Sequence, residues 1–202
     1  MFPLGSTVFP QQIVPLHIFE ERYRTLLEQI TSEDGSQTFG IVLIDRGHEV
    51  GGGASESRRS VGTRVEVLQA ERFDDGRWGI VVAGVERIEV VEWLPDDPYP
   101  RAVVTPRTVT DNGGSNLDEL ESSLSDTIAL FAKVSGAEAP DEYVFANDPQ
   151  VRLDQLSAVA PLGDFDRQRV LEATTTREQM SVLGSALHDK QMLLRARLGR
   201  SD

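Results

Sequence analysis

The feature of this chain that most limits its possible folds is a change of hydrophobic period at the polar segment TDNGGSN, residues 110–116. Before this segment, short apolar runs separated by Gly- and Asp-rich turns are typical of β-strands. After it, apolar residues recur every three or four positions, which is the spacing of one helix face. The sequence therefore predicts an α+β protein, with a β-rich unit over residues 1–110 and a helical unit over residues 111–202.

The β-rich half contains four apolar stretches that we expect to form strands. The third stretch should divide into two strands near Gly84, and the last should lie at a sheet edge because Pro106 cannot donate to a ladder. Several short strands with this spacing favour a small closed or nearly closed barrel. The four stretches are FGIVLI at 39–44, VGTRVEVLQAERF at 61–73, GRWGIVVAGVERIEVVEWL at 76–94 and RAVVTPRTV at 101–109.

One helix is expected to interrupt the strands, and about four more to follow them as a bundle. Asp148 followed by Pro149 predicts a helix start, because proline at the first helical position loses no hydrogen bond. Asp164 should begin another helix, and overlapping capping boxes at 175–179 should begin the last. The positions predicted to face the core are Phe19, Tyr23, Leu26, Leu27 and Ile30 in the inserted helix, Leu117, Leu120, Leu124, Ile128 and Phe131 in the first bundle helix, and Met180, Leu183, Leu187 and Leu194 in the last.

Charge and cysteine content argue against several classes of function. The net charge is −13 and the isoelectric point about 4.7, so the surface should repel nucleic acids, whose binding depends on Lys and Arg contacts to phosphate. A basic stretch at residues 167–200 keeps a nucleic-acid-binding module open as the alternative. The chain has no cysteine for a disulfide or thiolate site. Because it also has neither a bilayer-spanning apolar run nor a secretory signal, we expect a cytoplasmic protein.

The histidine in IVPLHIFEERY, residues 13–23, is the strongest candidate for a reactive group. His17 and Glu21 have the i, i+4 spacing of a helical zinc site. Pro15, however, favours an extended chain, so His17 should precede the helix, and Glu20 and Glu21 should complement the helix dipole in its first turn. We therefore interpret the stretch as a helix start, with no metal and no cofactor.

The remaining segments lack the pattern of an active site. The glycine-rich HEVGGGASES at 48–57 has no Lys-Ser/Thr pair to hold a phosphate and is interpreted as a loop between strands. No G-x-S-x-G elbow is present, and a Ser–Lys dyad would have only Lys133 or Lys190, neither of which lies in an apolar context that would activate it. The sequence thus predicts a protein that binds rather than catalyses.

The chain resembles the N-terminal substrate-binding domain of Lon proteases over nearly its whole length. The strongest block is FPLGSTVFPQQIVPLHIFEERYRTLLEQI, residues 2–30, followed by FGIVLI, VGTRVEVL, DGRWGIVVAGVERIEV and PYPRAVV in the family's order. LSAVAPLGDFDRQRVLEATTTREQMSVLGSAL, at 156–187, matches more loosely. The residues that carry the motif of the first block, as structural residues, are Pro15, His17, Phe19, Glu20 and Tyr23.

This resemblance implies a PUA-like β-barrel with one inserted helix, followed by a C-terminal helical bundle. It also implies a stand-alone bacterial member without the ATPase and protease domains of the peptidase, since the sequence has no Walker A motif, and hence a non-catalytic module. The expected partners are unfolded or partly folded proteins with exposed apolar segments, and a separate ATP-dependent protease is a further candidate. A membrane partner is not expected.

Four residues are candidates for the binding surface of such a module. Arg58 and Arg59 lie in a predicted loop at residues 45–60, where their charge would frame an apolar patch. Trp93 and Tyr99 flank a turn, and either line the same surface or belong to the core at the end of the barrel. Binding there would remove apolar surface from water, which is worth about 25 cal/mol per Å².

Overall fold

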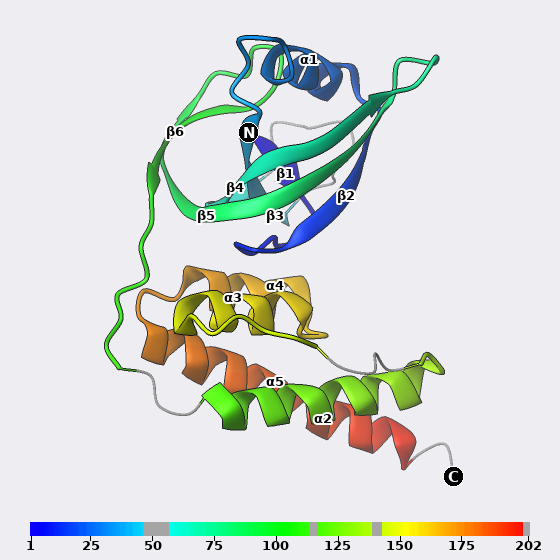
Figure 1. Ribbon diagram of the computed structural model, residues 1–202, viewed down its shortest axis with the longest axis vertical. Helices are drawn as coiled ribbons and strands as arrows, with labels where there is room; N and C mark the ends of the chain where they lie inside the picture. Colours follow the sequence, from blue (N-terminus) through cyan, green and yellow to red (C-terminus); the bar gives the residue numbers. More distant parts are fainter. Residues whose placement is uncertain (47–56, 114–116, 139–142, 200–202) are drawn as a thin grey trace. The chain divides into compact units, whose positions relative to one another are not determined.

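The computed structural model of this chain describes residues 1–46, 57–113, 117–138 and 143–199 (Figure 1). It divides into two compact units, Met1–Arg107 and Thr108–Asp202. Within the described ranges the first unit contains six strands and one helix, and the second contains four helices, so the α+β class is confirmed. The loop predicted at 48–57 lies outside the described residues, apart from its last residue, which begins a strand.

The first unit is built on one six-stranded sheet. Its strands are β1 (Phe2–Leu4), β2 (Ile13–Ile18), β3 (Thr38–Arg46), β4 (Ser57–Arg72), β5 (Trp78–Leu94) and β6 (Arg101–Pro106). Their order is β1-β3-β4-β5-β2, and β6 pairs with the second half of β5. The β1–β3 pairing is parallel and the others are antiparallel. The long strand β5 therefore holds three neighbours: β4 along most of its length, β2 at its start and β6 at its end.

Residues 78–94 form one continuous strand, so the predicted division near Gly84 is wrong. The β4–β5 register shifts at this point, between Arg64 and Val65, which pairs with Gly84. A Cβ atom at Gly84 would lie 2.0 Å from the carbonyl oxygen of Phe9. The glycine thus marks a close approach of the N-terminal loop to β5, which is the other meaning of glycine within a strand.

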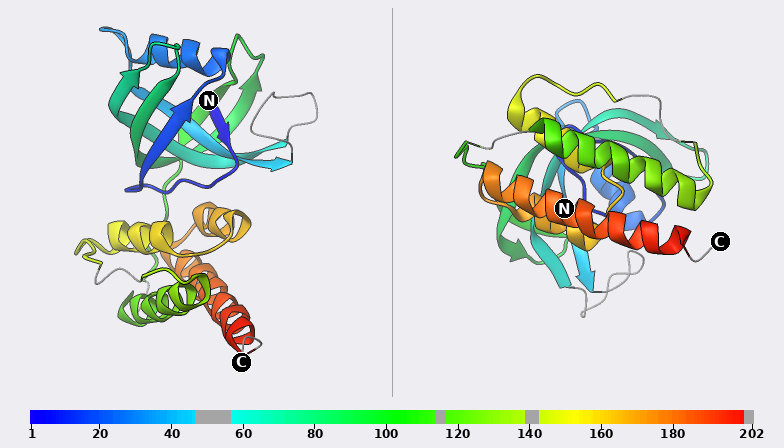
Figure 2. Two further views of the ribbon diagram at one scale, coloured as in Figure 1. Left: turned by 90° about the vertical axis from the view of Figure 1, so that its right-hand side faces the viewer. Right: turned by 90° about the horizontal axis from the view of Figure 1, so that it is seen from below.

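The core of the first unit lies between the sheet and α1, which spans Glu21–Ile30 (Figures 1 and 2). The expectation that Phe19 shares the buried helix face is wrong, because Phe19 precedes the helix and its side chain is 53% exposed. His17 lies in β2 and precedes the helix, as predicted. The predicted face is confirmed for Tyr23, Leu26, Leu27 and Ile30.

The described helices of the second unit are α2 (Leu117–Ser135), α3 (Pro149–Val159), α4 (Asp164–Glu172) and α5 (Thr176–Leu198). α2 and α5 pack along each other (Figure 2). Phe131 lies only at the edge of this contact: its side chain is partly exposed beside Lys190 of α5, and the buried face of α2 continues through Thr127 and Ala132. The predicted core positions that are buried are Leu120, Leu124, Leu183, Leu187 and Leu194.

The predicted starts of α3 and α5 are confirmed by their caps. Asp148 Oδ1 accepts hydrogen bonds from the backbone N–H groups of Gln150 and Val151, at 3.1 and 2.9 Å. Thr175 Oγ1 accepts from the backbone N–H of Glu178 at 3.2 Å. Both side chains satisfy N–H groups that have no partner inside the helix, which is why these residue types are favoured there.

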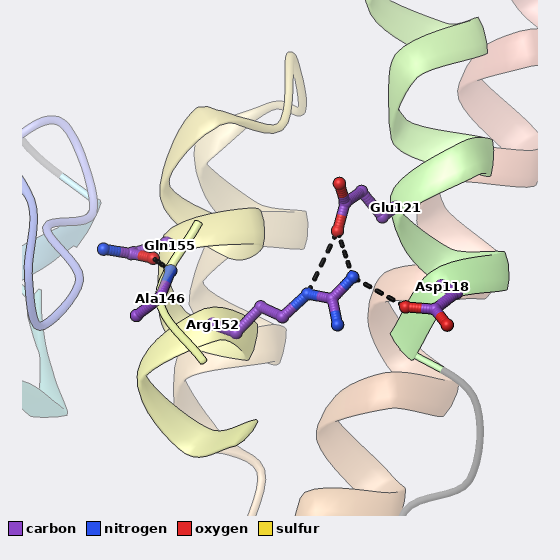
Figure 3. Close-up of polar contacts among 5 residues, drawn as sticks. All are labelled: Asp118, Glu121, Ala146, Arg152 and Gln155. Atoms are coloured by element: carbon purple, nitrogen blue, oxygen red, sulfur yellow. Dashed lines mark hydrogen bonds and ion pairs between the residues drawn. The ribbon is translucent and has the colours of Figure 1, made fainter. Parts of the chain in front are cut away.

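Side-chain hydrogen bonds fix α3 within the helical unit (Figure 3). The guanidinium of Arg152 donates to the carboxylate of Glu121 and, at 2.8 Å, to Asp118 Oδ1, both on α2. On the other side, Gln155 Oε1 accepts from the backbone N–H of Ala146 at 2.8 Å. These contacts join α3 both to α2 and to the segment that leads into α3.

Candidate functional site

A shallow apolar groove lies beside β2 in the first unit. Its larger hollow, of about 500 Å³, is lined by His17, Ile18, Phe19, Phe73, Arg77 and Trp78. A second hollow, of about 460 Å³, shares His17 and Phe73 and extends across β2, β5 and β4. We call the two hollows together the β2 groove. Its size is in the usual range for ligand-binding pockets.

The alternation of side chains along β2 explains why the groove forms on this face. Leu16 and Ile18 are buried, whereas Pro15 and His17 point to the opposite side and are exposed. Val81 and Gly79 of β5 pair with Pro15 and His17, and Gln69 and Glu71 of β4 pair with the same two β5 residues. The floor of the groove is therefore the outer face of three adjacent strands.

The hairpin between β4 and β5 supplies one wall. Phe73 follows β4, and its ring lies over Gly79, where an added Cβ would be 3.2 Å from Cζ. Trp78 begins β5, and the guanidinium of Arg72 lies 5.9 Å from its ring. A larger residue at position 79 would push the Phe73 ring away from the sheet, so the glycine sets the depth of the groove here.

Exposed apolar side chains surround the groove. Phe19 is 53% exposed and Phe73 is 39% exposed, and both line the larger hollow. Ile13, two positions from Pro15 on the same face of β2, is also exposed. Two partly exposed aromatic side chains that line one hollow make it a candidate for a surface that another molecule covers.

Two ion pairs lie near the groove. Arg77 Nε donates to Asp75 Oδ2 at 2.7 Å, and Arg72 pairs with Glu28 at 3.1 Å. The backbone N–H of Arg77, together with its side chain, lowers the pKa of the Asp75 carboxyl. These two pairs are solvent-exposed and locally neutral, whereas Glu71 adds a negative charge to the lining of the second hollow.

The residues around His17 do not form a metal centre. Across the described ranges, no three His, Asp or Glu side chains are placed to hold a metal ion. Glu20 is the N-cap residue of α1 and forms an ion pair with Arg22 at 3.1 Å. His17 therefore acts here as an exposed residue of the groove wall, next to a helix start.

None of the four predicted binding residues lines the groove, and Arg58 and Arg59 lie in β4, so their predicted place in a loop is wrong. The guanidinium of Arg58 lies 4.9 Å from the ring of Trp93, and Arg59 pairs with Asp45 at 2.7 Å. Tyr99 packs against the core. The structure thus brings Arg58 and Trp93 together but gives Arg59 a different neighbour, and a role of these residues in binding stays a prediction.

Sequence reasoning missed Phe73, Arg77 and Trp78. A usable signal was present in RFDDGRW, residues 72–78, where two aromatic residues flank a turn. The residues on either side of a hairpin turn pair with each other, as Arg72 and Trp78 do. Phe73 and Trp78 therefore lie at the same end of the sheet. Strand patterns alone do not reveal this, because the neighbouring strand β2 comes from a distant part of the sequence.

Within the described part of the basic stretch at 167–200, several cations contact other groups of the helical unit. Arg167 is buried and donates to the carbonyl oxygen of Ala158 at 2.9 Å. Arg177 donates to the carbonyl oxygen of Asn112 at 3.3 Å, and the ammonium of Lys190 lies 5.5 Å from the ring of Phe131. These contacts weaken the alternative of a nucleic-acid-binding face, because phosphate contacts need free cations.

The first unit is thus an α+β domain with an apolar surface groove, and the second unit is helical. A family model for the ATP-dependent protease La (LON) substrate-binding domain matches residues 1–189. The chain belongs to this family. No helix among the described residues is both long and apolar enough to cross a membrane.

Curated relatives align with most of this chain. The Lon protease of Heliobacterium modesticaldum is 24% identical over 198 residues, which is 96% of this chain and 24% of the relative. Lon protease 2 of Herpetosiphon aurantiacus is 26% identical over 194 residues, which is 93% of this chain and 23% of the relative. The chain therefore spans about a quarter of the length of these relatives.

Two solved structures share the fold. The Lon N-terminal domain protein from Xanthomonas campestris superposes with a TM-score of 0.62 at 19% identity, covering 90% of this chain and 94% of that one. The N-terminal domain of the Mycobacterium avium complex Lon protease gives a TM-score of 0.54 at 17% identity, covering 93% and 97%. At these identities the likeness concerns the fold alone.

Proposed function

We propose that this chain is a non-catalytic module that holds exposed apolar segments of unfolded or partly folded polypeptides in the β2 groove. Membership of the LON substrate-binding domain family supports a substrate-binding role. The observation that carries the assignment to this site is the pair of exposed aromatic side chains, Phe19 and Phe73, on the walls of the larger hollow.

The physical basis of binding is the removal of apolar surface from water. Burial is worth about 25 cal/mol per Å², or roughly 1.5–3 kcal/mol for a fully covered Phe side chain. A folded client keeps such side chains in its own core, so only its unfolded form can offer them. Because Arg72 and Arg77 are already paired with carboxylates, their attraction for acidic segments contributes little.

The same proposal extends to the setting in which the module works. The curated relatives carry this region as part of Lon proteases, which suggests a role in proteolysis or protein quality control. A separate ATP-dependent protease is a candidate partner, and the cytoplasm is the proposed location. The proposal includes the PUA-like barrel that the resemblance implies for the first unit. Since the proposed module is non-catalytic, we expect no cleavage of casein with or without ATP.

The test is a binding titration with a carboxymethylated, permanently unfolded protein and with its native form. We expect binding to the unfolded form alone. Phe19→Ser and Phe73→Ser should each weaken it about fivefold, since each removes about 1 kcal/mol of apolar burial. Phe165→Ser is the matched control, because Phe165 is 58% exposed on α4, outside the groove.

Two results would count against this site. Equal affinity for native and unfolded client would mean that exposed apolar segments are not what is recognised. Equal loss of affinity in the Phe19, Phe73 and Phe165 variants would mean that binding depends on general surface apolarity and not on the groove.

A further inference from the structure

Glu71, near the end of β4, is the one acidic side chain among the described residues that line the β2 groove. It is exposed, and within the described part of the chain its carboxylate forms no ion pair or hydrogen bond. By contrast, Arg72 and Arg77 beside it each have a carboxylate partner. The groove lining therefore carries a negative charge for which the described chain supplies no counter-ion.

Strand pairing places Glu71 and His17 on opposite sides of a glycine. Gly79 of β5 pairs with Glu71 of β4 on one side and with His17 of β2 on the other. Paired residues point to the same face of a sheet, so both side chains stand on the outer face, with no side chain of β5 between them. Neighbouring strands lie about 4.8 Å apart, which separates the two backbones by roughly 10 Å. Glu71 and His17 are thus the two flanks of the second hollow.

The ring of Phe73 lies between these flanks. Phe73 follows Glu71 by two residues, and its backbone N–H donates to the carbonyl of Arg77 at 2.8 Å, so the alternation of β4 continues to this position. The ring covers Gly79 and is 39% exposed. An aromatic face attracts a cation, and it also packs against the methylene groups of an Arg or Lys side chain. A free carboxylate beside an exposed ring is therefore suited to a long cationic side chain.

We propose that the second hollow is a subsite for an arginine or lysine of the client, and that Glu71 determines this preference. The inference rests on the proposed function, in which an apolar side chain of the client occupies the larger hollow. The two hollows share His17 and Phe73, so one client segment fills both, with its cation only a few residues from its apolar side chain. The cationic head group pairs with Glu71, and its methylene stem lies along the Phe73 ring.

The charge of the whole chain favours the same ligand. A net charge of −13 attracts basic segments over about a Debye length, which is about 10 Å at 0.1 M salt. An acidic segment is repelled both by this charge and by Glu71, and the nearby arginines are already paired. A neutral apolar segment still buries its surface but gains no ion pair. The expected order of affinity is therefore basic, then neutral, then acidic.

The test is a fluorescence anisotropy titration of the full chain with three short labelled peptides. All three carry the same Leu-Phe-Leu segment, followed two residues later by arginine, citrulline or glutamate; citrulline has the shape of arginine without its charge. We expect the arginine peptide to bind about fivefold more tightly than the citrulline peptide, as an exposed ion pair beside an aromatic ring allows. The glutamate peptide should bind most weakly, and high salt should bring the arginine-to-citrulline ratio of affinities toward one.

Glu71→Gln should lower the arginine-to-citrulline ratio to about one, because it removes the carboxylate that distinguishes the two peptides. Glu92→Gln is the matched control: Glu92 is exposed on β5, outside the groove lining, and its substitution removes the same unit of charge. This variant should keep the ratio of the parent chain. Circular dichroism checks that both variants keep their fold.

The outcomes separate the subsite from the proposed function. If the citrulline peptide binds and the arginine peptide binds no more tightly, the subsite is wrong and the apolar groove stands. A preference for arginine that survives Glu71→Gln, or that falls equally in Glu92→Gln, would come from the net charge and would overturn the role of Glu71. If none of the three peptides binds, both the subsite and the proposed function are wrong.

Discussion

Arg167 shows how a single residue can determine the packing of several elements. Its guanidinium, on α4, donates to the carbonyl oxygens of Ser157, Ala158 and Ala160 at the end of α3. These carbonyls have no partner inside the helix, so a positive charge there also complements the helix dipole. Burial lowers the pKa of Arg167, which Asp164 partly offsets, and the residue is a structural cation within the helical unit.

At this scale we predict that Arg167→Met destabilises the protein by about 2–4 kcal/mol, because buried carbonyl groups lose a charged donor. Urea denaturation measures the change. Arg169→Met is the control two residues away: Arg169 forms an exposed pair with Asp166 at 3.4 Å, and its loss should cost less than about 1 kcal/mol. Equal effects of the two substitutions would contradict the structural role of Arg167.

Among the elements, those governed by local chemistry were predictable from sequence and those governed by distant contacts were not. The start of α3 follows from Asp148 and its neighbours alone. By contrast, Gly84 depends on the approach of Phe9, and Phe131 stays partly exposed at the edge of the helix pair because Thr127 and Ala132 take the buried positions. The groove belongs to the second kind, since hairpin and β2 residues meet only through strand pairing.

The corresponding prediction concerns the cap of α3. Asp148→Ala leaves two backbone N–H groups without their acceptor and should lower the free energy of unfolding by about 1 kcal/mol. Amide exchange should rise in the first turn of α3. Asp148→Asn should recover most of the loss, because an amide oxygen also caps; failure of Asn to do so would mean that the negative charge, and not the cap, matters.

At the scale of the whole molecule, the chain consists of two units that each have their own buried residues. The core cluster that includes α1 draws on residues between Phe2 and Val82. The helical unit buries leucines from α2, α3, α4 and α5 around one another. A core of its own is the usual mark of a segment that folds independently.

We therefore predict that residues 1–107 expressed alone form a cooperatively folded β-rich protein. Far-ultraviolet circular dichroism during thermal unfolding measures this. The fragment should bind unfolded client within about threefold of the full chain, because every lining residue of the β2 groove lies in it. A fragment that is folded but does not bind would place part of the site in the helical unit.

The ion pairs that flank the groove, Arg77 with Asp75 and Arg72 with Glu28, have one more effect. Because these two arginines are already paired, they give the groove little preference for ligands rich in acidic residues. The main property of a ligand that still affects binding is whether an apolar segment is buried in its own core or exposed to solvent. Such a surface would serve many unrelated chains and would report on their state of folding rather than on their identity.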